Sequence, residues 1–232
     1  MSVRERLAEV RERLAAAARQ AGRDPESVRL VAVSKGHPAE ALREAYAAGQ
    51  RDFGENYVQE WTQKAESLSD LAIDWHLIGH LQRNKARQVV ERAAWVHSVD
   101  SVELARELGR RAAARPPSLG PVRVLVEVSI AGEAQKGGVP APELEAVLAA
   151  IEAEPALRLS GLMCIPPAAA SAAASRQPFD ELVRLRDRSG GAVRLPELSM
   201  GMTQDFEAAV ATGSTLVRIG TAIFGERAPR GA

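Results

Sequence analysis

Eight short apolar segments alternate with helix-like segments along this chain, and this alternation restricts the possible folds more than any other feature. The apolar segments cover residues 30–34, 52–54, 75–79, 95–98, 122–129, 159–164, 195–199 and 216–219. The intervening segments that favour helices cover residues 38–48, 56–68, 83–92, 102–114, 142–153, 179–189 and 203–211. Strands that alternate with helices form parallel β-α-β units. Eight such units predict an α/β fold, a single (β/α)8 TIM barrel, and an open doubly wound sheet is the alternative.

An extra amphipathic helix is predicted before the first strand. Its apolar positions recur at helical spacing and are Val3, Leu7, Val10 and Leu14. The chain has 232 residues, a length that suits an α/β barrel built as one domain. We see no domain linker and expect a single domain over residues 1–232. Residues 115–121 and 166–178 are rich in proline or small residues, so we expect loops there.

Composition excludes several classes of protein. The 30 basic and 30 acidic residues balance, so nothing favours a nucleic acid or an anionic membrane as partner. We find no apolar run of about 18 residues that would predict a membrane span. The first residues are charged and unlike a signal sequence, and the single Cys164 excludes an internal disulfide. We therefore expect a cytoplasmic protein.

Lys35 is the first candidate functional residue, because it directly follows the first predicted strand. Only four of the 30 basic residues are lysines, so arginine supplies most of the surface charge. A lysine amine, unlike a guanidinium, can lose its proton and attack a carbonyl. In barrels, functional groups gather at the C-terminal ends of the strands. The alternative is that Lys35 only marks the point where the strand meets solvent.

Two turns that contain glycine follow the last two predicted strands. Ser199 and Thr203 flank Gly201 after the seventh strand. Gly220 and Thr221 follow the eighth. Barrels often bind phosphate with these two loops, where backbone N–H groups approach the anion. The pattern predicts a phosphate site, and ordinary turn chemistry is the alternative.

Arg218 interrupts the otherwise apolar eighth strand, so its charge needs a partner or a ligand. One possibility is a buried ion pair with an acid such as Glu127. The other is a cation that faces the ring nitrogen of a cofactor. A lysine, a phosphate site and a partner for a ring nitrogen are together what pyridoxal 5′-phosphate (PLP) requires.

The chain resembles the pyridoxal phosphate homeostasis protein family, the YggS/PROSC type, whose barrel is like the alanine racemase N-terminal domain. The segments that carry the resemblance are residues 31–35, 53–57, 75–85, 97–100, 161–163, 198–202 and 217–221. The resemblance implies PLP bound to Lys35 as a Schiff base. It also implies cofactor contacts from Asn56, Ser199, Met200, Arg218, Gly220 and Thr221. It places the phosphate near Ser199, Gly220 and Thr221, and the ring nitrogen near Arg218. The chain departs from the family pattern after the lysine, where Gly36 and His37 replace the usual threonine.

The resemblance implies a non-catalytic protein that stores, carries and delivers PLP, with PLP-dependent apo-enzymes as recipients. Racemases with this barrel carry a second domain, which we do not expect here, since the chain ends soon after the eighth strand. We expect a monomer. A small racemase-like enzyme with weak activity is the alternative.

A third hypothesis is a metal-dependent barrel. Its candidate ligands would be His37, His76, His80 and His97. No two of them are predicted at i, i+4 on one helix, and no acidic cluster joins them. Of the remaining lysines, we expect Lys85 on a solvated helix face. We expect Lys136 in a solvated loop, with transient receipt of PLP as its alternative role.

Overall fold

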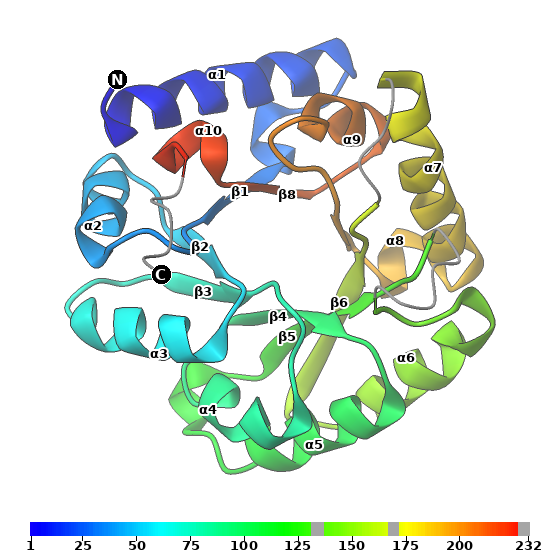
Figure 1. Cartoon of the computed structure of the whole chain (residues 1–232). Helices are drawn as coiled ribbons and strands as arrows, with labels where there is room; N and C mark the ends of the chain where they lie inside the picture. Colours follow the sequence, from blue (N-terminus) through cyan, green and yellow to red (C-terminus); the bar gives the residue numbers. More distant parts are fainter. Residues whose placement is uncertain (131–136, 167–171, 227–232) are drawn as a thin grey trace, which may run out of the picture.

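The eight predicted strands pair in sequence order and β8 pairs back with β1, so the sheet closes into a barrel (Figure 1). This computed structural model describes residues 1–130, 137–166 and 172–226. The strands are β1 (Arg29–Val33), β2 (Asp52–Glu55), β3 (Asp74–Leu77), β4 (Trp95–Val99), β5 (Val122–Glu127), β6 (Leu157–Met163), β7 (Glu197–Ser199) and β8 (Leu216–Ile219). All eight neighbouring pairs are parallel. Closure confirms the barrel and excludes the open sheet.

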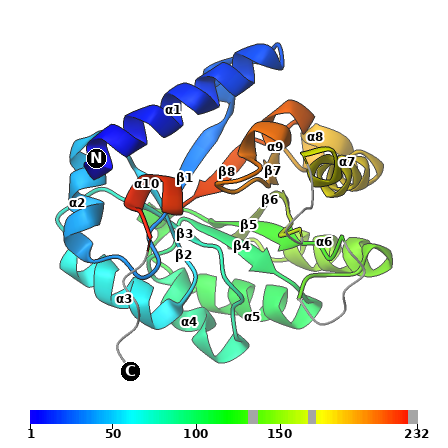
Figure 2. The ribbon, with the colours of Figure 1, turned by 45° about the horizontal axis from the view of Figure 1, so that its top comes forward.

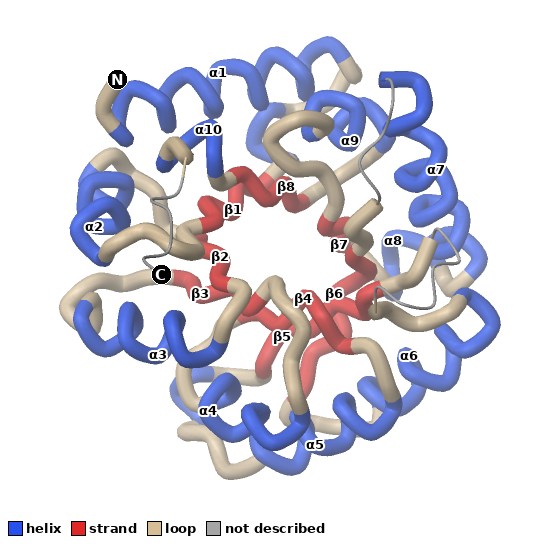
Figure 3. Tube along the Cα trace, viewed as in Figure 1, coloured by secondary structure: helices blue, strands red, loops and turns tan. Residues whose placement is uncertain are grey.

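Helices surround the barrel, as Figure 3 shows by colour. They are α1 (Val3–Gln20), α2 (Ala39–Ala47), α3 (Val58–Ser67), α4 (Ala86–Val90), α5 (Val102–Ala112), α6 (Leu144–Glu152), α7 (Ala172–Arg188), α8 (Gly191–Arg194), α9 (Phe206–Thr212) and α10 (Thr221–Phe224). Parallel strands need crossover connections, and the crossovers cover the outer face of the sheet. In the described part of the chain, none of the helices combines the length and the apolar character that crossing a membrane requires.

The predicted N-terminal helix is α1. Ser2 Oγ accepts a hydrogen bond from the backbone N–H of Glu5 (3.2 Å), and the Glu5 carboxylate accepts one from the backbone N–H of Ser2 (2.9 Å). This reciprocal pair satisfies two N–H groups that a helix start leaves open. The apolar stripe of α1 is buried and packs against α9 and α10 (Figures 1 and 2).

The apolar core has two layers. The larger one lies between the strands and the helices. A smaller cluster contains Val31, Trp95, Leu125, Met163 and Leu216, one residue from each of five strands. Side chains of a strand alternate between its two faces, so this second cluster fills the inside of the barrel. The barrel is therefore a packed core, and polar chemistry is left to its C-terminal end and to a few buried polar groups.

The structure corrects one loop prediction. Helix α7 begins at Ala172, so residues 172–178, expected as loop, are helical and include Pro178. Residues 167–171 of the same stretch lie outside the described part, as does Lys136. Helices α8 and α10 were not predicted, because a helix of four residues is too short to show a 3.6-residue period.

Candidate functional site

The predicted site residues meet at one end of the barrel because parallel strands all point the same way. Lys35 follows β1, Asn56 follows β2 and Ser199 ends β7. Arg218 lies in β8, directly opposite Val31 of β1. Thr221 begins α10. The closed order of strands makes β1 and β8 neighbours (Figure 1), so the ends of these two strands, which the first and last candidates along the sequence follow, are adjacent.

A buried lysine that sequence reasoning did not single out lies behind this site. Lys64 of α3 is 7% exposed. Its Nζ donates hydrogen bonds to Glu55 Oε1 (2.5 Å), Glu60 Oε1 (2.7 Å) and the backbone oxygen of Ser34 (2.7 Å). Ser34 Oγ donates to the same Glu55 oxygen (2.7 Å). The pKa of Glu55 is raised, because burial outweighs the opposing effect of Lys64.

This Lys64 cluster fixes the backbone on both sides of Lys35. The Ser34 carbonyl accepts from Lys64, and the Gly36 N–H donates to Glu60 Oε1 (2.5 Å). Lys35 itself is half-buried between these two anchored residues. The sequence held a signal for this arrangement: Lys64 is spaced i+3 from the buried Trp61, on the apolar face of its helix.

Asn56 supplies a buried polar atom that the protein leaves without a partner. Its Oδ1 is buried and accepts no hydrogen bond. The backbone of Asn56 lies against Gly79, where a Cβ atom would be 2.3 Å from the Asn56 carbonyl oxygen. Buried side-chain oxygens are normally hydrogen-bonded, so this one is suited to a donor group on a ligand.

Arg218 is buried, at 3% exposure, and is held by neutral acceptors. Its Nη1 donates to Ser199 Oγ (2.6 Å) and its Nη2 donates to the backbone oxygen of Cys164 (2.9 Å). Among the described residues no carboxylate lies within ion-pair distance, so the predicted alternative of an ion pair with Glu127 is wrong. Burial lowers the pKa of Arg218, but a guanidinium keeps its proton in proteins. Two of five N–H groups are used, and the others suit an acceptor on a ligand.

Ser199 is the last residue of β7 and is buried, and it is not exposed in the loop that follows this strand. Its hydroxyl is fully buried and contacts Arg218 and His97 Nδ1 (2.9 Å). Met200 is also fully buried, in the larger core. The cofactor contacts of both residues stay predictions, and the geometry gives Ser199 a second role as the support of Arg218.

Glycines shape the predicted phosphate end. A Cβ atom at Gly201 would lie 2.6 Å from the Cβ of Ala209, and one at Gly220 would lie 3.0 Å from the carbonyl oxygen of Val33. The backbone of each glycine therefore lies so close to a neighbouring segment that a side chain would not fit there. Thr221 is exposed at the first position of α10, whose first N–H groups have no partner within the helix. These features suit an anion.

The histidines do not form a metal site. His76 and His97 bond to each other inside the barrel (Nδ1 to Nε2, 2.9 Å), whereas His37 stacks on Phe224. The described residues contain no group of three or more histidine, cysteine or acidic side chains that could hold a metal ion. The metal-dependent hypothesis therefore gains no support from the described part of the chain.

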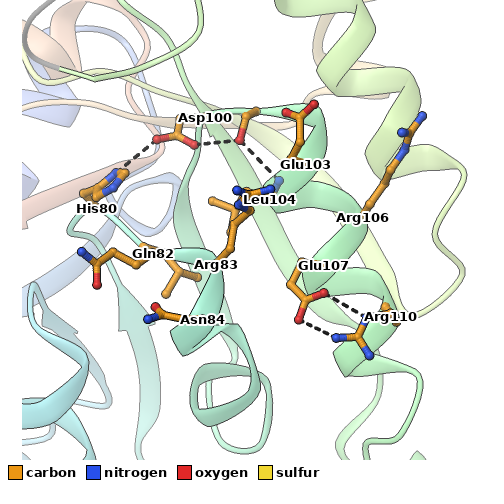
Figure 4. A pocket seen from close by; sticks show the side chains of 12 residues that line it. His80, Gln82, Arg83, Asn84, Asp100, Glu103, Leu104, Arg106, Glu107 and Arg110 are labelled. Carbon is orange, nitrogen blue, oxygen red and sulfur yellow. Dashed lines mark hydrogen bonds and ion pairs between the residues drawn. The ribbon is translucent and has the colours of Figure 1, made fainter.

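A hollow of about 880 Å³ lies outside the predicted site, on the rim between residues 80–84 and α5 (Figure 4). His80 Nδ1 pairs with Asp100 there (3.1 Å), and Glu107 binds Arg110 (2.7 Å). Its charges are of both signs and largely exposed, so we assign it no ligand. Lys85 does not line it.

Comparison with known proteins identifies the family of the chain. A family model described as alanine racemase, N-terminal domain, matches residues 6–228. The pyridoxal phosphate homeostasis protein of Pseudomonas aeruginosa is 48% identical over 227 residues, which cover 97% of this chain and 96% of that protein. The protein of the same description from Escherichia coli (strain K12) is 44% identical over 235 residues and covers 95% of both chains.

Solved structures give the same result. PipY of Synechococcus elongatus PCC7942, determined with PLP bound, has a TM-score of 0.83 and 41% identity, and the match covers 97% of this chain and 100% of PipY. Alanine racemase from Corynebacterium glutamicum has a TM-score of 0.65 at 18% identity, covering 95% of this chain and 62% of the racemase. The second likeness concerns the fold alone.

Proposed function

The chain belongs to the pyridoxal phosphate homeostasis protein family, and on that premise we propose that it binds PLP at Lys35 and keeps this cofactor available to other proteins. Arg218 is the observation that carries the proposal. A buried guanidinium that is held only by neutral acceptors and uses two of its five N–H groups suits a further acceptor from outside the protein. The ring nitrogen of PLP is such an acceptor.

The remaining site residues fit the same ligand. When bound, PLP supplies an aldehyde that reacts with a lysine amine and a pyridine ring that withdraws electrons. Lys35 holds the aldehyde end, and the unsatisfied Asn56 Oδ1 accepts from the cofactor. The backbone at Gly220 and Thr221 receives the phosphate, and the predicted contacts of Ser199 and Met200 with the cofactor are part of the same proposal. Because Arg218 keeps its proton, it can only donate a hydrogen bond to the ring nitrogen, which therefore stays unprotonated. A ring with an unprotonated nitrogen is a weak electron sink.

A weak electron sink favours holding PLP over turning over an amino acid. The chain has two tyrosines as candidate acid–base residues. Tyr46 lies on α2, where Arg51 Cζ is 3.8 Å from the centroid of its ring, and we therefore assign Tyr46 no role at the site. Tyr57 follows Asn56 at the site and is 54% exposed. The position of Tyr57 beside Asn56 is the observation that favours a weak racemase-like activity as the second candidate function.

The proposal extends to the setting in which the protein acts. PLP-dependent apo-enzymes are the proposed recipients, and the carrier acts in the cytoplasm as a monomer. Transfer would be tested by mixing the PLP-loaded protein with an apo-enzyme and following the recovery of that enzyme's activity. A rate no faster than that from free PLP would contradict delivery.

Reduction with borohydride tests the attachment itself. Wild type, Lys35→Ala and the matched lysine control Lys85→Ala would be mixed with PLP, reduced, digested and analysed by mass spectrometry. We expect PLP on the Lys35 peptide in wild type and in Lys85→Ala, together with an absorbance band that reduction removes. Lys35→Ala should show neither. Equal labelling of Lys35→Ala would refute the assignment. Sustained conversion of an amino acid by wild type, lost in Lys35→Ala, would favour the enzyme.

A further inference from the structure

A continuous chain of polar side chains, buried except for the half-buried Asp52, crosses the inside of the barrel and ends at Arg218. Arg218 Nη1 contacts Ser199 Oγ (2.6 Å), which contacts His97 Nδ1 (2.9 Å). His97 Nε2 contacts His76 Nδ1 (2.9 Å), and His76 Nε2 contacts Asp52 Oδ1 (3.0 Å). Each residue comes from a different strand, and Asp52 begins β2 at the end of the barrel opposite the site. Beyond Arg218 and Ser199, the binding of PLP proposed above assigns no role to the residues of this chain.

The carboxylate of Asp52 fixes the direction of the hydrogen bond that it makes with His76 Nε2. Burial acts to raise the pKa of Asp52, but His76 and Arg29 outweigh it and hold the pKa below its ordinary value. Arg29 Nη1 also donates to Asp52 Oδ1 (2.9 Å). An ionised carboxylate only accepts hydrogen bonds, so His76 Nε2 must carry a hydrogen.

The donor and acceptor in each of the remaining hydrogen bonds follow from the neutral state of the two imidazole rings. Burial lowers the pKa of His76 and lowers that of His97 well below its ordinary value, so neither ring carries a charge near neutral pH. A neutral imidazole has one donor and one acceptor. His76 Nδ1 is then an acceptor, and His97 Nε2 donates to it. His97 Nδ1 is in turn an acceptor for the Ser199 hydroxyl.

This order leaves the lone pairs of Ser199 Oγ facing the Arg218 guanidinium. The opposite order would place the lone pair of His76 Nε2 against the Asp52 carboxylate. In that order Ser199 Oγ would accept hydrogen bonds from both His97 and Arg218, and its own hydroxyl hydrogen would have no acceptor among the described residues. Repulsion at one end and an unsatisfied hydroxyl at the other therefore exclude the opposite order.

The surroundings of the two rings also hold them in place. His76 and His97 are fully buried. The His76 ring stacks on the Trp95 indole with centroids 5.4 Å apart and planes 7° apart, and His97 meets the same indole at 64°. Ring rotation would break this packing as well as two hydrogen bonds.

We propose that Asp52, His76 and His97, acting through Ser199, are positioning residues for Arg218. Asp52 sets the direction of the hydrogen bonds from one end of the barrel, and Ser199 presents a neutral oxygen to the guanidinium at the other. The two hydrogen-bond acceptors that hold the guanidinium are therefore neutral, and its nearest carboxylates, Glu127 and Asp205, act on it only through space, which leaves N–H groups of Arg218 for the ligand. The part of this inference that concerns the ring nitrogen of PLP rests on the function proposed above.

Nitrogen-15 NMR of the ligand-free protein tests the hydrogen-bond order directly. We expect both His76 and His97 as the Nε2–H tautomer, and a slowly exchanging guanidinium resonance from Arg218. Asp52→Leu removes the carboxylate without adding a donor or acceptor. It should populate the Nδ1–H tautomer of His97 and speed exchange at Arg218. Asp74→Leu is the matched control, because Asp74 pairs in register with Asp52 but has no hydrogen bond to the chain.

A second variant keeps the test decisive if Asp52→Leu does not fold. Ser199→Ala deletes only the hydroxyl, so it should speed exchange at Arg218 and leave both histidine tautomers as in wild type. PLP binding should weaken roughly 10-fold in either variant, by comparison with outer-shell partners of bound groups. The Nδ1–H tautomer of His97 in wild type, or unchanged Arg218 exchange in both variants, would overturn the inference. If wild type shows the expected tautomers but does not bind PLP, the proposed function fails and the positioning of Arg218 stands.

Discussion

Replacement of Lys64 by methionine should destabilise the protein and loosen its site together. Methionine keeps the length of the side chain and suits a helix, so the change is mainly the loss of the charged amine. Glu55 is fully buried and would keep only the Ser34 hydroxyl, since its Oε2 already has no partner. The Ser34 carbonyl would lose its bond to Lys64, which frees one side of Lys35.

The magnitude follows from the burial of the pair. Removing one member of a buried ion pair costs about 3–5 kcal/mol, because an uncompensated charge stays inside. In a protein of this size 1 kcal/mol shifts the melting temperature by about 2–4 °C, so we expect a fall of about 6–20 °C. An exposed pair would instead contribute about 1 kcal/mol or less.

The loss should depend on pH in a defined direction. Burial raises the pKa of Glu55 in the folded protein, so the folded state binds this proton more readily than the unfolded chain. The resulting penalty is complete above the folded pKa and disappears as pH falls below the ordinary value for glutamate. Without Lys64 the pKa of Glu55 rises further. The difference between variant and wild type should therefore be largest at neutral pH and narrow on acidification.

Thermal and urea denaturation, followed by circular dichroism at neutral and mildly acidic pH, would measure this loss. Lys85→Met is the control for loss of a lysine outside the cluster. The double variant Glu55→Gln with Lys64→Met removes both charges and should recover part of the stability. A loss below about 1 kcal/mol, or one that does not change with pH, would refute the buried-charge reasoning.

Two further predictions concern neighbouring residues. Gly79→Ala should cost about 1–3 kcal/mol and weaken PLP binding, because its Cβ would meet the Asn56 backbone, which cannot rotate away. A melting temperature equal to that of wild type would contradict this close approach. Burial raises the pKa of the Cys164 thiol to about 12, so the folded protein should resist a thiol-specific disulfide reagent at pH values where the unfolded chain reacts. Rapid labelling of the folded protein would show that Cys164 is not enclosed.

The barrel, and the position of the candidate residues at the C-terminal ends of its strands, could be predicted from the sequence because both depend on local patterns. A strand or helix of ordinary length shows its own periodicity, and functional groups follow strand ends in barrels. Lys35 and Arg218 could therefore be chosen before any contact was known. The helical start of the segment after β6 could not, because Pro178 and small residues there resemble a loop.

The partners of those residues were decided only by the tertiary structure. His97 and Ser199 are 102 residues apart, and their hydrogen bond exists because strand register and barrel closure bring β4 and β7 to the same interior. Glu127 was an equally reasonable partner for Arg218 on charge alone. The sequence by itself determined the strands, their order and the chemical groups at their ends. Distance and direction between side chains on different strands determined which of those groups touch, and a hydrogen bond depends on both.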